Sequence, residues 1–264
     1  MFAKLLKYEW KASKGILGIL SLAALGAGIL GAVVLRVLII NLTRMEQAQG
    51  AMVMLPALLI LALVFLMLGL FAYGIGSELF LLYRFYKNKF NDEGYLTFTL
   101  PATPKQIFLA SFVNMAIWML IITVVLLAAM GILILGGIIS TGYVDFPVEY
   151  GEFFGAFEIP WDMVAVNLLY GIMSFVYSIV MCMTAVTVGA VAAKKHKLLA
   201  AFGIYYGISM VYGIVQTAMM VAMTLSNSIG TPAYYLPEIG FQVLLILVGF
   251  FLSTYLMEKK LNLP

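Results

Sequence analysis

Hydrophobic residues occur in six long runs, separated by segments in which polar residues and prolines gather. The runs cover about residues 15–40, 51–82, 107–140, 163–193, 198–225 and 239–257. A helix needs roughly 20 mostly apolar residues to cross the hydrocarbon of a bilayer. The runs are continuous rather than alternating, which argues against a transmembrane β-barrel. The pattern therefore predicts an all-α, polytopic membrane protein with six transmembrane helices in a single domain, residues 1–264.

Composition supports lipid as the solvent for most of the chain. Of 264 residues, 64% are hydrophobic and only 10% are charged, whereas a soluble domain has about 25% charged residues. This shortage of charge excludes an ordinary soluble enzyme, a secreted disulfide scaffold and a disordered protein. One cysteine, Cys182, and one histidine, His196, cannot build a disulfide or a zinc site. We expect no catalytic residues and no metal site in this chain.

The charges predict the orientation in the membrane. If the N-terminus lies inside, 13 of the 15 basic residues fall on the inner side, and only Arg36 and Arg44 fall on the outer side. This distribution follows the positive-inside rule. It also accounts for the net charge of +3 without a nucleic-acid partner. We expect a multi-pass protein of the cell membrane with both termini in the cytoplasm and no cleaved signal peptide.

The first 14 residues predict a helix that lies along the membrane interface. Four lysines at spacings of three and four share one face, and apolar residues including Leu5, Leu6 and Trp10 lie broadly opposite. Glu9 falls on the apolar side. Two interpretations stay open: the carboxylate extends to water, or it pairs with a basic group on a neighbouring element.

The longest inner connection, residues 83–106, is much longer than a helix reversal requires. It contains a basic stretch, the acidic pair Asp92 and Glu93, then exposed aromatic and aliphatic residues, and Thr103–Pro104 mark the start of the next helix. Such a loop is typical of a protein-docking surface. The alternative is that its aromatic residues lie in the membrane interface.

Few polar groups are expected inside the bilayer. Arg36 and Glu78 are the main charged residues of the runs and lie near their ends, so no central acidic or histidine relay suggests an ion-coupled carrier. Polar stripes follow the fourth and fifth runs, and we interpret them either as contacts between helices or as part of a substrate path. Gly203 and Gly207 form a small-xxx-small pair that would permit close helix contact.

The chain contains no motif for ATP binding or for the hydrolytic chemistry that known enzyme motifs indicate. The sequence contains no G-x-x-x-x-G-K-[ST] loop for ATP, no H-E-x-x-H zinc helix and no G-x-S-x-G nucleophile elbow. Transport, if it occurs, must therefore be powered by another protein.

The string KLLKYEWKAS near the N-terminus and the loop FYKNKFNDEGYLTFTLPATPKQI, together with six runs and inner termini, resemble the permease subunits of type 2 ABC transporters of Gram-positive bacteria. The specific likeness covers the first 15 residues and about residues 78–107. The resemblance implies a dimer of two permease subunits, identical or related, bound to two separate ABC ATPase subunits that carry ATP and Mg²⁺. No cofactor is then expected in this chain, and its other partner is membrane lipid.

The resemblance also assigns roles to residues. It implies an interfacial helix over 1–14, with Leu5, Leu6, Glu9 and Trp10, and a cytoplasmic coupling helix over about 86–104 between the second and third spans. The residues implied for contact with the ATPase are Asn91, Asp92, Glu93, Gly94, Tyr95, Leu96, Phe98, Leu100 and Pro101. Those implied for the substrate path or dimer interface are Tyr205, Tyr206, Ser209, Tyr212 and Gln216.

The sequence thus favours the membrane subunit of an ATP-driven exporter of an amphipathic or hydrophobic substrate, with peptides ranked before lipids and drugs. Two alternatives remain open: a signalling or scaffold module that docks a cytoplasmic partner without transport, and an ion-coupled carrier.

Overall fold

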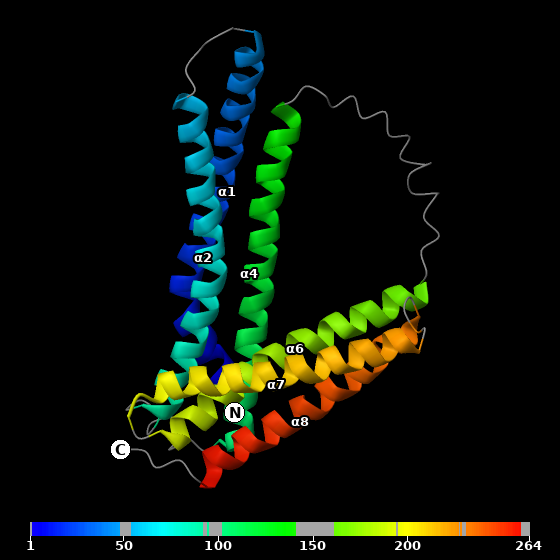
Figure 1. Ribbon diagram of the computed structural model, residues 1–264. Coiled ribbons are helices and arrows are strands. Elements are labelled where there is room, and N and C mark those ends of the chain that lie inside the picture. Colours follow the sequence, from blue (N-terminus) through cyan, green and yellow to red (C-terminus); the bar gives the residue numbers. More distant parts are fainter. Residues whose placement is uncertain are drawn as a thin grey trace. The chain divides into compact units, whose positions relative to one another are not determined.

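The computed structural model describes residues 2–47, 54–91, 94, 102–140, 161–193, 195–226, 228 and 231–259. These residues form helices and no strand (Figure 1). In chain order the elements are α1 (Phe2–Gln47), α2 (Met54–Phe90), α4 (Pro104–Ser140), α6 (Trp161–Ala192), α7 (Lys197–Leu225), the 3-10 turn η1 (Pro232–Tyr234) and α8 (Leu236–Lys259). Six helices within the described ranges are long and apolar enough to span a membrane. The predicted all-α class and six membrane-length helices are confirmed.

Several helices are longer than the bilayer requires. With a rise of about 1.5 Å per residue, the 46 residues of α1 extend roughly 69 Å, more than twice a hydrocarbon core of about 30 Å. A helix of this length either tilts strongly or projects beyond the lipid.

Residues 2–14 are helical but do not form an element of their own. Helix α1 continues without a break from Phe2 to Gln47, because no proline interrupts the chain near Lys14 and Gly15. The lysines of this segment are exposed, and Leu5, Leu6, Glu9 and Trp10 are partly buried. The structure therefore differs from the separate interfacial helix expected from the sequence.

Helix α2 extends further than the hydrophobic run suggested. It ends at Phe90 rather than near residue 82, so the segment 83–90 is helical and is not part of a loop. The reason is that Phe85 and Phe90 are both buried and pack edge to face, with ring centroids 5.7 Å apart. Residues 83–90 of the expected connection 83–106, and residues 86–90 of the expected coupling segment 86–104, therefore belong to α2.

Helix α4 begins at a capping box. The backbone N–H of Gln106 donates to the Thr103 hydroxyl, and the N–H of Thr103 donates to the Gln106 side-chain oxygen, each at 3.4 Å. Pro104 occupies the first helical position, where its missing N–H costs nothing. The start of the third span is confirmed at the residues that the sequence indicated.

The described residues belong to two compact units. One contains residues 10–80 and 117–156, in which α1, α2 and α4 run side by side (Figure 1). Ser21 of α1 shares a hydrogen bond of 2.8 Å with Tyr73 of α2. A Cβ added at Gly28 of α1 would lie 2.8 Å from the backbone of Ala129 in α4. Close helix approach in this unit therefore depends on small residues.

The other unit contains residues 1–9, 81–116 and 157–264, and α6 lies at the centre of its C-terminal helices. Helix α6 packs along both α7 and α8, which touch each other much less. The most apolar stretch of α6 is 61% buried, against 6% for α7. A Cβ at Gly189 would lie 2.5 Å from the backbone of Ala201, and one at Gly249 would lie 2.9 Å from the Thr184 hydroxyl, so both contacts require glycine.

The turn between α6 and α7 contains a left-handed residue. His196 precedes the first turn of α7 with φ 55° and ψ 43°. Residues other than glycine adopt this conformation at some cost. It lets the chain reverse within a few residues, which brings Ala201 against Gly189.

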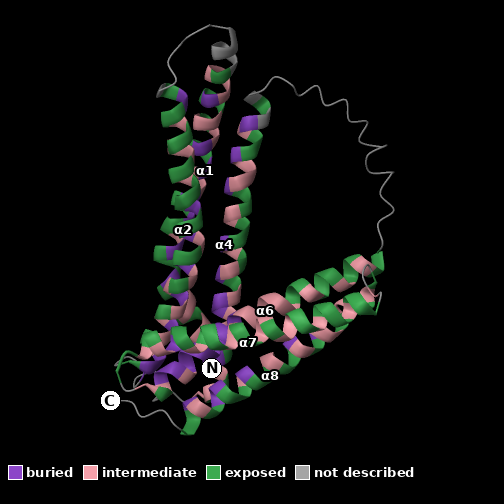
Figure 2. Ribbon diagram, in the orientation of Figure 1, coloured by how far each residue is buried: buried purple, intermediate pink, exposed green. Residues whose placement is uncertain are grey.

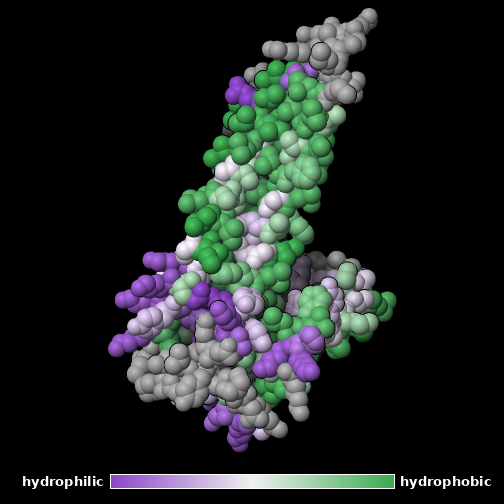
Figure 3. Space-filling model, turned by 90° about the vertical axis from the view of Figure 1, so that its left-hand side faces the viewer, coloured by the Kyte–Doolittle hydropathy of each residue, from purple (hydrophilic) through white to green (hydrophobic). Residues whose placement is uncertain are grey.

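The surface of the helices is mostly apolar. Exposed residues predominate along α7 (Figure 2), and hydrophobic side chains cover much of the long helices on the face shown in Figure 3. The exposed side chains on these membrane-length helices include many leucines, isoleucines, valines and phenylalanines. Such an apolar surface is suited to contact with lipid.

Candidate functional site

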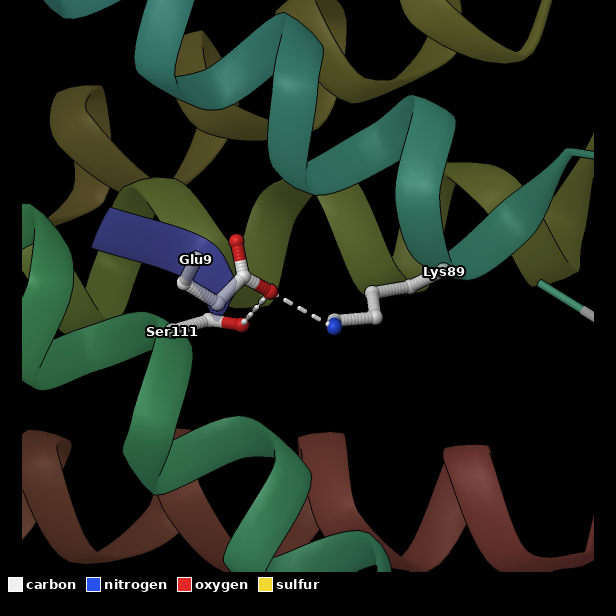
Figure 4. Close-up of polar contacts among 3 residues, drawn as sticks. All are labelled: Glu9, Lys89 and Ser111. Carbon is white, nitrogen blue, oxygen red and sulfur yellow. Dashed lines mark hydrogen bonds and ion pairs between the residues drawn. The ribbon is translucent and has the colours of Figure 1, made fainter. Parts of the chain in front are cut away.

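Glu9 forms a buried polar contact with two other helices. Lys89, in the last turn of α2, donates to Glu9 Oε1 at 2.7 Å, and the Ser111 hydroxyl of α4 donates to the same oxygen at 3.2 Å. Figure 4 shows the Glu9 carboxylate between the two donors. Of the two interpretations of Glu9, the structure supports pairing with a basic group on a neighbouring element.

The surroundings explain why this pair forms. The side chains of Lys89 and Glu9 are 5% and 11% exposed. The end of α2 is an aromatic cluster in which Phe85 also packs edge to face on Phe108 of α4, with centroids 6.3 Å apart. An ammonium group this deeply buried is strongly destabilising unless a counter-charge compensates it. Glu9 supplies that charge, so the first turns of α1 are held to α2 and α4.

The contact lies beside the segment expected to bind an ATPase. Lys89 is two residues before Asn91, and Ser111 lies in the second turn of α4, shortly after residue 103. Of the residues implied for ATPase contact, only Asn91 and Gly94 are described: Asn91 is exposed, and its carbonyl accepts a hydrogen bond of 2.7 Å from the buried Gly94 N–H. The others, Asp92, Glu93, Tyr95, Leu96, Phe98, Leu100 and Pro101, lie outside the described residues.

Trp10 has a defined contact within the unit of α1, α2 and α4. Its ring stacks on Trp118 with centroids 4.7 Å apart. Trp118 Nε1 donates to the Ser13 hydroxyl at 2.8 Å, and that hydroxyl donates to the Trp10 carbonyl at 3.2 Å. The early turns of α1 are thus fixed on α4 by an aromatic pair and one hydrogen bond, from Trp118 to Ser13.

The residues implied for the substrate path do not form one group. Tyr205 and Tyr206 are 36% and 61% exposed on α7, and Ser209 is partly buried. Tyr212 and Gln216 instead donate hydrogen bonds to Glu238 of α8, at 2.9 Å and 2.7 Å. The polar stripe of the fifth span therefore divides into an exposed tyrosine pair and a set that contacts another helix.

Glu238 is the centre of a second polar cluster, which we did not predict from the sequence. Tyr170 of α6 also donates to Glu238 Oε1, at 2.8 Å. One turn along α8, Gln242 donates to the hydroxyls of Ser174 and Tyr212, both at 3.0 Å. Two signals were available: the polar stripes of the fourth and fifth spans, and the spacing of Glu238 and Gln242 by four residues, which places both on one face of a helix.

Gly203 and Gly207, which were expected to permit close helix contact, make none within the described residues. Nothing lies within 4 Å of a Cβ added at either glycine. The close contacts of α6 are made at Gly189 and Gly249 instead. Glycine is common in membrane helices, so a spaced pair does not by itself identify the contacting face.

The chain has no match among known protein families, curated proteins or solved structures. The contact of Glu9, Lys89 and Ser111 can position the ends of three helices.

Proposed function

We propose that this chain is the membrane-spanning subunit of an ATP-driven exporter whose ATPase is a separate protein. Its six apolar helices provide the transmembrane part. Its sequence lacks the phosphate-binding loop that would hold ATP. In this proposal, ATP and Mg²⁺ bind to two partner ATPase subunits, a second permease subunit completes the assembly, and an amphipathic peptide is the first candidate for cargo.

The observation that carries the proposal is the buried contact of Glu9 with Lys89 and Ser111. The segment 91–103 begins two residues after Lys89 and ends eight residues before Ser111. Both of its ends are therefore anchored to the start of α1. A docking segment that transmits movement from an ATPase needs rigid attachment of this kind, because a loosely held loop would absorb the displacement.

Co-purification tests the proposal directly. The tagged chain is co-expressed with candidate P-loop ATPases, and the ATPase retained per chain is measured after detergent extraction. We expect one of them to be retained at about equal stoichiometry. Glu93→Gln combined with Tyr95→Ala should reduce retention by about tenfold or more, as expected when central contacts of an interface are removed.

The matched control is Glu149→Gln with Tyr150→Ala, the same pair of changes in the connection expected on the outer side. It should leave retention unchanged. If the complex survives changes throughout 91–103, the docking assignment is wrong. Transport driven by an ion gradient without ATP would support the carrier alternative, and a stable partner without transport would support the signalling or scaffold alternative.

A further inference from the structure

The carboxylate of Glu238 lies in the first turn of α8, at one end of a membrane-length helix, and has an unusual set of partners. Its Oε1 accepts three hydrogen bonds, from the hydroxyls of Tyr170 and Tyr212 and from Gln216 Nε2, at 2.7–2.9 Å. Hydrogen bonds to an ionised carboxylate are about twice as strong as neutral ones. Three neutral donors from α6 and α7 therefore surround a negative group on α8.

No positive group compensates this charge within the described residues. Glu238 forms no ion pair with a basic side chain among them. Acidic residues within membrane spans are costly, and they usually pair with a positive group or belong to a binding pathway. A cationic ligand would provide the missing counter-charge.

Gln242 provides an independent observation that points to a ligand. It is 1% exposed, and its Nε2 donates to Ser174 and to Tyr212, the latter also a donor to Glu238. Its Oε1 is buried and has no hydrogen-bond partner in the described chain. A buried acceptor without a partner is destabilising by about 1–3 kcal/mol, so an N–H donor that reached this oxygen would stabilise the cluster.

The open acceptors define the ligand. The three bonds to Glu238 all end on Oε1, so within the described residues Oε2 and the Gln242 Oε1 are left to accept. Aromatic rings surround the cluster: Tyr170 lies 5.4 Å from Tyr235, and Tyr212 lies 5.9 Å from Phe241, between ring centroids. Aromatic faces attract cations. A divalent metal ion would need about six oxygen ligands, more than these two open acceptors supply.

We propose that Glu238 and Gln242, together with the surrounding tyrosines, bind the protonated primary amine of a small or amphipathic ligand. The ammonium group carries the required charge, and its several N–H bonds can reach more than one acceptor. If the chain transports its ligand, which rests on the function proposed above, the cargo would carry such an amine.

The experiment measures binding of an amine to the chain rather than transport, so the result does not depend on an ATPase. The full chain is purified in uncharged detergent, and equilibrium dialysis measures radiolabelled 2-phenylethylamine against protein-free micelles. We expect saturable binding of about one amine per chain. Losing one charge-assisted hydrogen bond is worth about 1.5–3 kcal/mol, so Glu238→Gln should weaken binding by roughly tenfold or more. Gln242→Met should weaken it by a smaller factor.

The matched control variant is Glu258→Gln, the same change at an exposed position of the same helix, and it should bind as the unaltered chain does. Two analogues test the chemistry on the unaltered chain, so a variant that fails to fold does not remove the test. The trimethylammonium analogue keeps the charge but has no N–H, and 2-phenylethanol has no charge. Both should compete at least about tenfold more weakly, because the first cannot donate a hydrogen bond to the carboxylate and the second cannot supply the positive charge.

Three results would overturn the proposal: no saturable binding above the micelle control, equal competition by the trimethylammonium analogue, or unchanged binding by a folded Glu238→Gln protein. Equal competition would show that any organic cation suffices. Unchanged binding by that variant would show that the cluster only joins α6, α7 and α8.

Discussion

The buried pair of Glu9 and Lys89 gives the sharpest prediction about stability. Its atoms are 2.7 Å apart, and the two side chains are 11% and 5% exposed. Replacing one partner of a buried pair costs about 3–5 kcal/mol, because the other charge is left buried without compensation. Glu9 is not fully enclosed, so we expect Glu9→Gln to lower the free energy of unfolding by about 3 kcal/mol, at the lower end of that range.

The double variant Glu9→Gln with Lys89→Met isolates the interaction. Replacing both charges by neutral groups of similar size removes the desolvation cost together with the attraction, and this is often neutral or stabilising. We expect the double variant to lie within about 1 kcal/mol of the unaltered protein, which restores about 2–3 kcal/mol of the loss caused by Glu9→Gln alone. The single variant Lys89→Met completes the cycle from which the coupling energy is obtained.

Detergent denaturation followed by tryptophan fluorescence measures these values, because Trp10 stacks on Trp118 next to the substituted residue. Lys11→Met is the control: Lys11 is exposed on the same helix, so its effect should stay within about 0.5 kcal/mol. A coupling energy below about 0.5 kcal/mol, as for an exposed pair, would refute the reasoning that burial makes this contact strong.

The remaining predictions concern helix contacts, the turn and the topology. Gly28→Ala should destabilise the protein by about 1–3 kcal/mol in the same assay, because the added Cβ would lie 2.8 Å from the backbone of Ala129. Gly26→Ala is the control and should not destabilise the protein, because nothing lies within 4 Å of its added Cβ. Equal effects of the two substitutions would contradict the packing described. His196→Gly should stabilise the protein by up to about 1 kcal/mol by relieving its positive φ of 55°, and a loss of stability would show that the imidazole makes a contact worth more than the strain. A cysteine placed at Glu149 in a Cys182→Ser background should react with an impermeant thiol reagent only from outside the cell; labelling from the cytoplasm would reverse the orientation predicted from the lysines and arginines.

Some features of the contacts follow from the sequence and others do not. Thr103 and Pro104 indicated the start of α4, because the signals that begin a helix are local to a few residues. The sequence did not indicate the partner of Glu9, because Lys89 lies 80 residues away and several other lysines were equally available to pair. The aromatic residues that extend α2 to Phe90 were mistaken for a loop, since charged residues interrupt them.

The sequence by itself determined the class of the protein: six helices of membrane length, because continuous apolar runs of this size have no other stable arrangement in lipid. It also determined where most helices begin and end, through prolines, caps and the limits of the apolar runs. Only the tertiary structure decided which polar groups meet. Glu238 is one acidic residue among twelve in the sequence, and it became the centre of a cluster because the packing of α6 against α7 and α8 brings Tyr170, Tyr212 and Gln216 to it. Side-chain periodicity shows which residues share a face, but it carries no information about which face another helix will cover.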